Sequence, residues 1–141
     1  MRFLPVLACS LLTFGALAAQ SPTPAGTWTG KWDSPDGSVY SATVQLTVAS
    51  DGTVDGSINW KLTAARRSDL DPKVGLHGTE FVRGTFDAHC RVLTMGGYKL
   101  DDPEHVLGMD HYELILAPNG AGLGGVTENN GAWTGMLSLR R

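Results

Sequence analysis

Cysteine is scarce in this sequence, with only Cys9 and Cys90 among 141 residues. Cys9 lies in an N-terminal segment that we expect to be removed, so Cys90 would stand alone in the mature chain. One cysteine forms no disulfide within a chain, which excludes a disulfide framework as the source of stability. An apolar core and backbone hydrogen bonds must therefore hold the fold together. Cys90 itself is expected to be either a buried small residue or a free thiol able to pair between chains.

Long apolar runs are also missing, since the apolar stretch within residues 1–19 is too short for a membrane-spanning helix. It follows one positive charge at Arg2 and ends in the small residues Ala18 and Ala19, a pattern that predicts a secretory signal peptide. A lipoprotein signal with a lipidated Cys9 is the alternative. The protein is accordingly expected to be exported, to the periplasm or to the extracellular space.

Positive charge is in the minority, with 11 Lys and Arg against 14 Asp and Glu. Removal of Arg2 with the signal peptide takes the formal net charge from −3 to −4. A negative chain has no long-range attraction for nucleic acid or for an anionic membrane, so neither is expected as a partner. The remaining length, about 120 residues, suits a single domain with one core.

Catalytic motifs are absent as well. No Gly-x-Ser-x-Gly frames a nucleophile, and His89 and Cys90 are neighbours in an expected turn, where their side chains diverge. A pair of carboxylates drawn from Glu80, Glu113 and Glu128, as in glycoside hydrolysis, is the route to catalysis that stays open. We predict no catalytic residues, so a binding role is favoured over an enzyme.

Histidine and carboxylate residues do gather around one expected strand, at Asp110, His111 and Glu113. These are side chains that zinc accepts as ligands. On a regular strand, however, Asp110 faces away from the other two, so a further ligand such as His77 or Glu80 would have to come from a neighbouring strand. We therefore predict no metal site and no cofactor.

The sequence does contain a series of short segments in which apolar and polar residues alternate. Val44, Leu46 and Val48 are separated by polar residues, which is typical of a strand with one buried face. Turn formers such as Asp51-Gly52 and Asn119-Gly120 separate these segments. Strands are expected over residues 27–32, 39–48, 53–61, 76–87, 91–99, 109–117, 122–127 and 132–140. The pattern predicts an all-β fold, an eight-stranded antiparallel meander that closes as a small barrel.

Glycine and tryptophan mark both ends of this predicted barrel. The stretch from Gly26 to Trp32 and the stretch from Gly131 to Gly135 each place a Trp between two glycines, which indicates that the first and last strands are neighbours. Residues 20–26 are expected to form a flexible lead-in, and 27–141 to form the single β-barrel domain. Four small residues on the expected core faces would leave room for a cavity: Gly30, Gly56, Gly84 and Gly135.

The segment Gly26-Thr27-Trp28 resembles the Gly-x-Trp motif on the first strand of the calycins, the group of lipocalins and avidin-like proteins. Asp110-His111-Tyr112 is a loose counterpart of a motif on a later lipocalin strand, and Arg140 matches the basic residue that covers the first Trp in such proteins. The resemblance implies a barrel that binds a ligand or a partner. It does not extend to biotin, because Gly30 stands where the avidin-like proteins have a polar residue.

The candidate binding residues are aromatic and basic. The four tryptophans fall on expected core faces, where they either fill the barrel or line a cavity that opens at one end. Residues 62–75 interrupt the meander with an expected turn or two of helix that ends at Asp71-Pro72. This segment is either a lid over the entrance, with charge from its arginines, or a solvated crossover. The candidate residues are Trp28, Trp32, Trp60, Trp133, Arg66 and Arg67.

Two functional hypotheses follow from this pattern. The first is a secreted or periplasmic, non-catalytic binding module that holds a small apolar ligand inside the barrel. The second is a protein-interaction or inhibitor barrel that acts on another extracytoplasmic protein through its outer surface and rim loops. Large side chains filling the barrel interior would favour the second hypothesis.

Overall fold

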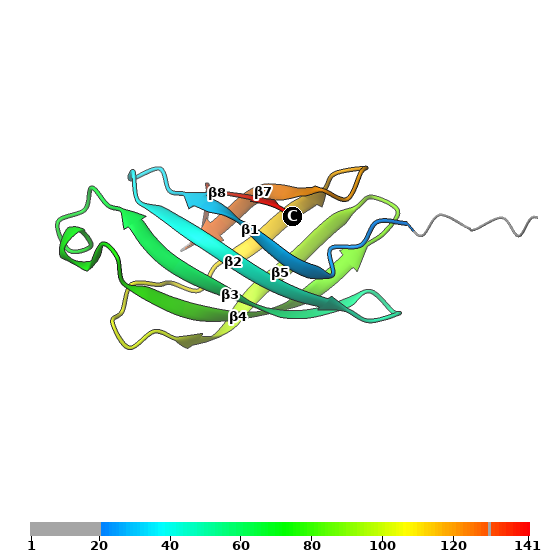
Figure 1. Ribbon diagram of the computed structural model, residues 1–141, viewed down its shortest axis with the longest axis horizontal. Helices are drawn as coiled ribbons and strands as arrows, with labels where there is room; N and C mark the ends of the chain where they lie inside the picture. Colours follow the sequence, from blue (N-terminus) through cyan, green and yellow to red (C-terminus); the bar gives the residue numbers. More distant parts are fainter. Residues whose placement is uncertain (1–20, 130) are drawn as a thin grey trace, which may run out of the picture.

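The computed structural model describes residues 21–129 and 131–141, so the predicted signal peptide at 1–19 lies outside the described residues. All eight predicted strands are present (Figure 1). They are β1 (Gly26–Asp33), β2 (Val39–Val48), β3 (Thr53–Ala64), β4 (His77–Asp87), β5 (Val92–Asp101), β6 (His111–Leu116), β7 (Gly122–Asn129) and β8 (Ala132–Arg140). A short 3-10 helix, η1 (Asp71–Lys73), lies between β3 and β4. No helix in the described ranges is long and apolar enough to cross a membrane.

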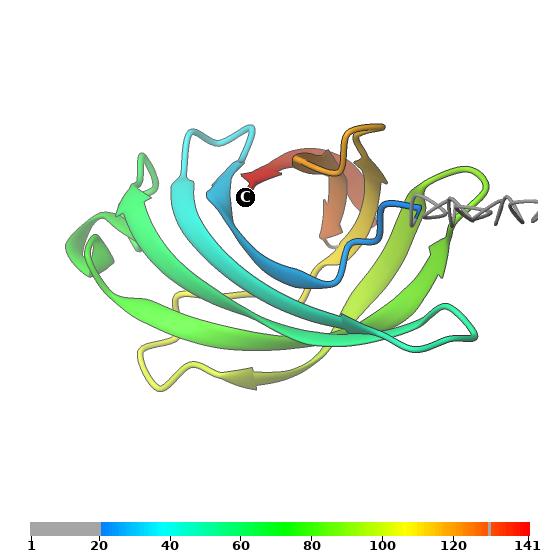
Figure 2. The same cartoon turned by 45° about the vertical axis from the view of Figure 1, so that its right-hand side comes forward.

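The strands form a closed antiparallel barrel, as predicted. Each strand pairs with the next along the chain, and β1 pairs with β8 to complete the ring. At this seam Gly30 lies opposite Leu139 and Trp32 lies opposite Leu137. Figure 2 shows the long, curved strands β2 to β4 wrapping around the interior. Closure leaves no unpaired strand edge along the seam, which removes a site for unwanted pairing with other chains.

Strand alternation builds the core. In β2 the side chains of Tyr40, Ala42, Val44 and Leu46 are buried, and the residues between them are exposed. The same period of two runs through the other strands, so their apolar residues meet inside the barrel. Trp28 is fully buried among them. One apolar core therefore stabilises the fold, and in the part of the chain that the structure describes Cys90 forms no disulfide.

Arginine closes the Trp28 end of the barrel, but the residue is Arg141, not the Arg140 that the resemblance implied. The Arg141 guanidinium lies 4.3 Å from the centre of the Trp28 ring. It also donates hydrogen bonds to backbone carbonyls of Gly120 and Ala25, at 2.8 and 2.7 Å. Arg140 is exposed, because it follows the buried Leu139 on β8 and so points outward.

Most of the core-face glycines allow neighbouring strands to approach closely and do not provide space for a cavity. A Cβ atom on Gly30, Gly56 or Gly84 would collide with a carbonyl oxygen of the adjacent strand. These glycines therefore let neighbouring strands bend tightly against each other. The expectation that all four core-face glycines leave room for a cavity was wrong for these three. Gly135 alone of the four borders the cavity described below.

The segment between β3 and β4 differs from its prediction. Residues 62–64 continue β3 because Leu62 exchanges backbone hydrogen bonds with Gly75 and Leu76, at 2.8 and 3.0 Å. The single helical turn, η1, begins where the helix was expected to end. Pro72 favours this position, since the first turn of a helix needs no N–H from it. Outside the sheet, Cys90 is exposed in the turn after β4, so it is a free thiol and not a buried core residue.

Candidate ligand-binding pocket

A cavity of about 420 Å³ opens at the end of the barrel opposite Arg141. Its walls come from strands β1 to β4 and β6 to β8, and its rim from the β1–β2 turn, the loop between β5 and β6, and residues 65–76, which contain η1 and are called the η1 segment below. Figure 1 shows the turn and the η1 segment at one end of the molecule and the lead-in at the other. Because the Trp28 end is packed and capped, the cavity opens at one end only.

Three aromatic residues on consecutive strands form one wall. Trp32 on β1 lies opposite Tyr40 on β2, with ring centres 5.6 Å apart, and Tyr40 lies 6.2 Å from Trp60 on β3. Both pairs are edge-to-face, an arrangement that aromatic quadrupoles favour. The Trp32 indole donates to the Thr127 hydroxyl at 2.7 Å, and the Tyr40 hydroxyl donates to the carbonyl of Val106 at 2.7 Å. With their polar atoms bonded to protein, Trp32 and Tyr40 offer the cavity mainly ring surface.

Glu80 on β4 lies at the base of the pocket and is only 1% exposed. Its Oε1 accepts a hydrogen bond from the backbone N–H of Asp110 at 3.1 Å. Its Oε2 accepts from the Trp60 indole at 3.1 Å and from the Tyr112 hydroxyl at 2.5 Å. Burial raises the pKa of this carboxyl from 4.5 to about 7, although the three donors oppose the shift. Gly97 on β5 makes room for the group, since a Cβ there would collide with Oε1.

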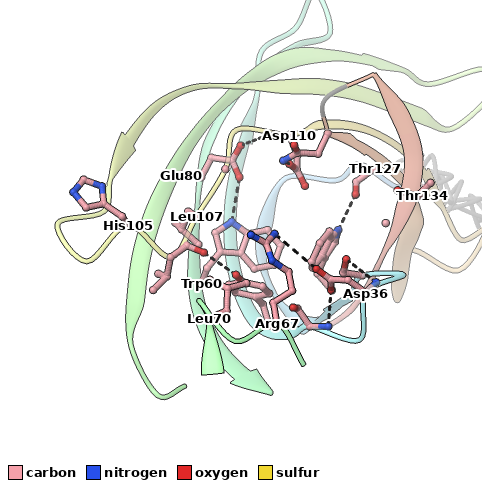
Figure 3. A pocket seen from close by; sticks show the side chains of 18 of the residues that line it. Asp36, Trp60, Arg67, Leu70, Glu80, His105, Leu107, Asp110, Thr127 and Thr134 are labelled. Carbon is pink, nitrogen blue, oxygen red and sulfur yellow. Dashed lines mark hydrogen bonds and ion pairs between the residues drawn. The ribbon is translucent and has the colours of Figure 1, made fainter. Parts of the chain in front are cut away.

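Asp110 supplies a second buried carboxyl directly before β6 and is 8% exposed. Its Oδ1 accepts a hydrogen bond from the side-chain amide of Asn129. Burial raises the pKa of the Asp110 carboxyl as well. Figure 3 shows the two carboxylate side chains, Glu80 and Asp110, side by side at the inner end of the pocket. The base of the cavity is therefore acidic.

Arg67 stands at the mouth of the pocket (Figure 3). Its guanidinium pairs with Asp69 at 2.7 Å and lies 3.9 Å from a carboxylate oxygen of Asp36 across the opening. Two acids thus accompany Arg67, so its positive charge is compensated at the mouth.

Two rim segments are tied together beside Arg67. Lys73 of η1 donates to the carbonyl oxygens of Glu104 and His105, both at 2.9 Å. The loop that contains these residues is braced by Asp102, whose carboxylate accepts the backbone N–H groups of Val106 and Leu107. The segment after β3 therefore borders the entrance.

Ser38 is the one residue of the described chain with a buried side-chain polar atom that has no hydrogen-bond partner. It lines the cavity and is 2% exposed. Its backbone N–H donates to Asp36 at 2.8 Å, and its hydroxyl oxygen lies near the same carboxylate but makes no hydrogen bond of good geometry within the described part of the protein. A buried hydroxyl without a partner costs free energy unless something else satisfies it.

The structure brings together three of the six candidate residues. Trp32, Trp60 and Arg67 line the pocket, whereas Trp28 lies in the packed core beyond it. Arg66 packs against the β1–β2 turn, where a Cβ on Gly37 would touch its side chain. Whether any of these residues binds a ligand stays a prediction.

Trp133 departs from its expected place on the core face and is 49% exposed. The pairing of β7 with β8 shifts by one residue here: Thr127 lies opposite Gly135, but Glu128 lies opposite Trp133. Thr134 is the extra residue in this bulge. An inserted residue reverses the alternation, so Trp133 faces outward beside Glu128.

Sequence reasoning missed the role of the buried polar residues. It gives Glu80 only as a metal or catalytic candidate, Asp110 as a metal candidate and part of the resemblance, and Tyr112 only as part of the resemblance. Among the described residues no group of three His, Cys, Asp or Glu side chains is placed to hold a metal ion. His111 lies on the outer face, 3.6 Å from Glu128. The sequence did contain a sign that Glu80 is buried, since it lies two residues before Val82 on β4 and so points to the same, inner face.

Comparison with known proteins adds a structural likeness. No protein family and no curated protein matches the sequence. A solved structure, described as a redesigned β-barrel, mFAP0, bound to DFHBI, is similar with a TM-score of 0.61 and 15% sequence identity. The match covers 84% of this chain and 98% of that chain. It shows that this chain shares the fold of that barrel, and at this identity it carries information about the fold alone.

Proposed function

We propose that this protein is an exported, non-catalytic binding module that holds a small molecule in the open end of its barrel. The observation that carries the proposal is the cavity of about 420 Å³, walled by aromatic rings and based on convergent polar groups. Small-molecule sites have this size and this mixture of apolar wall and few placed polar groups. The similar redesigned barrel is described with DFHBI bound, which supports a binding role for this architecture.

The composition of the pocket refines the predicted ligand. A purely apolar molecule would fit the wall of Trp32, Tyr40 and Trp60 but would leave Glu80 and Asp110 facing apolar surface. Desolvated carboxyls next to apolar groups are unfavourable. The proposed ligand therefore has an apolar or aromatic body and at least one polar group. We also propose to group the chain with the lipocalin and avidin-like barrels, on the basis of its closed eight-stranded barrel and the Gly-x-Trp motif on β1.

Native mass spectrometry of the mature protein, purified from its own host, tests the proposal. We expect an excess mass that disappears on denaturation, and a chain mass that shows loss of residues 1–19. Trp32→Ala should lose the excess mass, because Trp32 forms part of the pocket wall. Trp133→Ala is the matched control, since it removes an exposed Trp outside the pocket. A bare chain in every preparation would contradict ligand binding, and a full-length chain would contradict export through a cleaved signal.

The alternative, a protein-interaction barrel, is supported by a patch on the outer face of β6 to β8. Val126 lies directly opposite Met136, and Ile115 lies diagonal to Val126. These three residues are 39%, 59% and 58% exposed. Contiguous exposed apolar residues mark interaction surfaces more often than isolated ones do. If the native mass spectrum shows a bare chain, copurification with wild-type protein but not with Met136→Ser tests this second function.

A further inference from the structure

We propose that the occupant of the pocket is a small organic cation, a protonated amine carried on an aromatic or apolar body. This inference rests on the proposed function, because it names the class of ligand that the barrel would bind. Three separate features of the pocket lead to it: two carboxyl groups at its inner end, an aromatic wall and a buried hydroxyl without a partner.

The two carboxyl groups at the inner end of the pocket have no positively charged partner within the described chain. No Lys, Arg or His of the described chain lies within 4.0 Å of the Glu80 or Asp110 carboxylate. Buried charges in proteins are normally paired, and an uncompensated one destabilises the fold. Glu80 Oε2 already accepts two hydrogen bonds, but Oε1 accepts only one and has a lone pair to spare. A protonated amine provides both the missing charge and the missing donor.

The aromatic wall suits the same ligand. Rings of Trp and Tyr attract cations to their faces and also bury apolar surface. Trp32 and Tyr40 have their polar atoms engaged with Thr127 and Val106, so they cannot turn these atoms to a ligand without breaking existing bonds. The rings are therefore placed to hold the body of the ligand, while the carboxylates hold its charged end.

Arg67 does not reverse this charge preference. It lies at the mouth and not at the base, and its side chain is 55% exposed. Asp69 and Asp36 both accompany it, so its positive charge is compensated at the rim. The imidazole of His105, the other basic group that borders the pocket, projects away from the cavity in Figure 3. An anionic ligand would therefore meet two buried carboxylates with no free cation beside them.

Ser38 provides an observation independent of charge. Its buried hydroxyl lines the cavity and lacks a partner in the described structure. A hydroxyl oxygen accepts an N–H and its hydrogen can be donated in turn, so a polar group on the ligand would satisfy it. The Ser38 hydroxyl thus adds a third polar group, besides the two carboxyls, that a hydrogen-bonding ligand would satisfy.

Binding of a cation has a distinctive proton signature. The Glu80 pKa of about 7 means that the free protein carries a partly protonated carboxyl at neutral pH. Asp110 and Tyr112 face Glu80 directly, and Arg67, Asp36 and Asp69 face it from the rim. A positive ligand lowers the Glu80 pKa and expels the proton, whereas a neutral or anionic ligand does not. Proton release thus separates charge recognition from simple filling of the cavity.

The test uses matched sets of compounds that differ only in the charge of the side chain. Tryptamine, indole-3-ethanol and indole-3-propionate form one set; phenethylamine, phenethyl alcohol and 3-phenylpropionate form the other. Isothermal titration calorimetry of the mature protein, in phosphate and in Tris at pH 7, measures affinity and proton release. We expect an amine to bind about 10-fold or more tightly than its neutral and anionic counterparts, with release of protons to the buffer.

Variants test whether the carboxyl groups at the inner end of the pocket cause the amine preference and the proton release. Glu80→Gln is expected to lower amine affinity about 10-fold or more and to abolish proton release. Asp110→Asn provides a second reading of the same charge if Glu80→Gln fails to fold. Glu113→Gln is the control, because Glu113 is exposed on the outer face of β6. Circular dichroism and urea unfolding establish that each variant is folded before titration.

The outcomes distinguish the ligand class from the binding function. Neutral or anionic compounds that bind as tightly as the amines, in both sets, would overturn the cation inference and leave the binding function standing. If no compound binds, the ligand retained in native mass spectrometry decides: a basic nitrogen supports the inference and its absence overturns it. No binding together with a bare chain would overturn both proposals.

Discussion

Glu80 and Tyr112 form a hydrogen-bonded pair between β4 and β6 at the base of the pocket. The Tyr112 hydroxyl donates to Glu80 Oε2 at 2.5 Å, and both residues are at least 99% buried. Charge-assisted hydrogen bonds are the strongest in proteins, and burial strengthens them further. The pair joins two strands that are not neighbours in the sheet, since β5 lies between them. It therefore braces the barrel interior where the cavity begins.

The raised pKa of Glu80 makes stability depend on pH. The carboxyl has a pKa of about 7 when folded and 4.5 as its ordinary value, so the folded state binds the proton more tightly. Its contribution to stability is present below about pH 4.5 and is lost as the pH rises through about 7. From pH 5 to pH 8, wild type should lose about 2.5 kcal/mol of unfolding free energy relative to Glu80→Gln. Urea unfolding at both pH values measures this difference.

The control for this pH effect is Glu113→Gln. Glu113 is exposed on β6 and its replacement leaves the Glu80 carboxyl in place, so the pH dependence of wild type should persist in Glu113→Gln. Only the change between the two pH values counts, because Glu80→Gln also alters hydrogen bonds at the base of the pocket. A constant difference between wild type and Glu80→Gln across this range would show that the folded pKa of Glu80 is not raised.

Tyr112→Phe should raise the pKa of Glu80 further. The Tyr112 hydroxyl stabilises the ionised carboxylate, and its removal leaves burial opposed by two donors, Trp60 and the Asp110 backbone. Carbon-detected NMR titration of the Glu80 carboxyl should show a midpoint above that of wild type. The variant should also lose about 1–2 kcal/mol more stability at pH 8 than at pH 5. Tyr98→Phe, at an exposed tyrosine, is the control, and an unchanged Glu80 midpoint in Tyr112→Phe would contradict the pairing.

Two tryptophans on strands at the seam should differ sharply in their effect on stability. Trp28 is fully buried, so Trp28→Ala should cost about 3–5 kcal/mol of unfolding free energy. Trp133 is half exposed beyond the bulge in β8, so Trp133→Ala should cost less than about 1 kcal/mol. Urea unfolding of the two variants makes the comparison. Equal losses would show that Trp133 belongs to the core and that the bulge does not turn it outward.

The fold was predictable because its signals are local and repeated. In strands such as β2, the alternation of apolar and polar residues shows which face is buried, and turn formers mark where each strand ends. Closure followed from the matching patterns at the two ends of the chain. These signals need no knowledge of which side chains meet across the barrel, so the sequence alone could carry them.

The site was less predictable because it depends on register. Trp133 has the parity of Leu137 and Leu139, but one inserted residue in β8 turns it outward, and no residue type marks that insertion. Glu80 also has core-facing parity, yet its partners Trp60 and Tyr112 come from two other strands. Only the paired sheet shows that three donors meet this carboxylate. The covering residue was mispredicted for the same reason. Arg140 follows the buried Leu139 on β8 and points outward, so the next residue, Arg141, covers Trp28.

Arg141 is expected to stabilise the capped end of the barrel, whereas Arg140 is not. Arg141→Ala removes a cation over the Trp28 ring and hydrogen bonds to the carbonyls of Gly120, Ala25 and Thr23. Because these groups are partly exposed, the loss of unfolding free energy should be about 1–2 kcal/mol.

Arg140→Ala is the matched control and should cost less than about 0.5 kcal/mol, since the Arg140 side chain is exposed on the outer face of β8. Arg141→Lys keeps the charge but not the planar fork that reaches three carbonyls, so its loss should lie between the two. Urea unfolding followed by tryptophan fluorescence measures all three variants. A larger loss in Arg140→Ala than in Arg141→Ala would return the covering role to Arg140, the residue that the family resemblance implied.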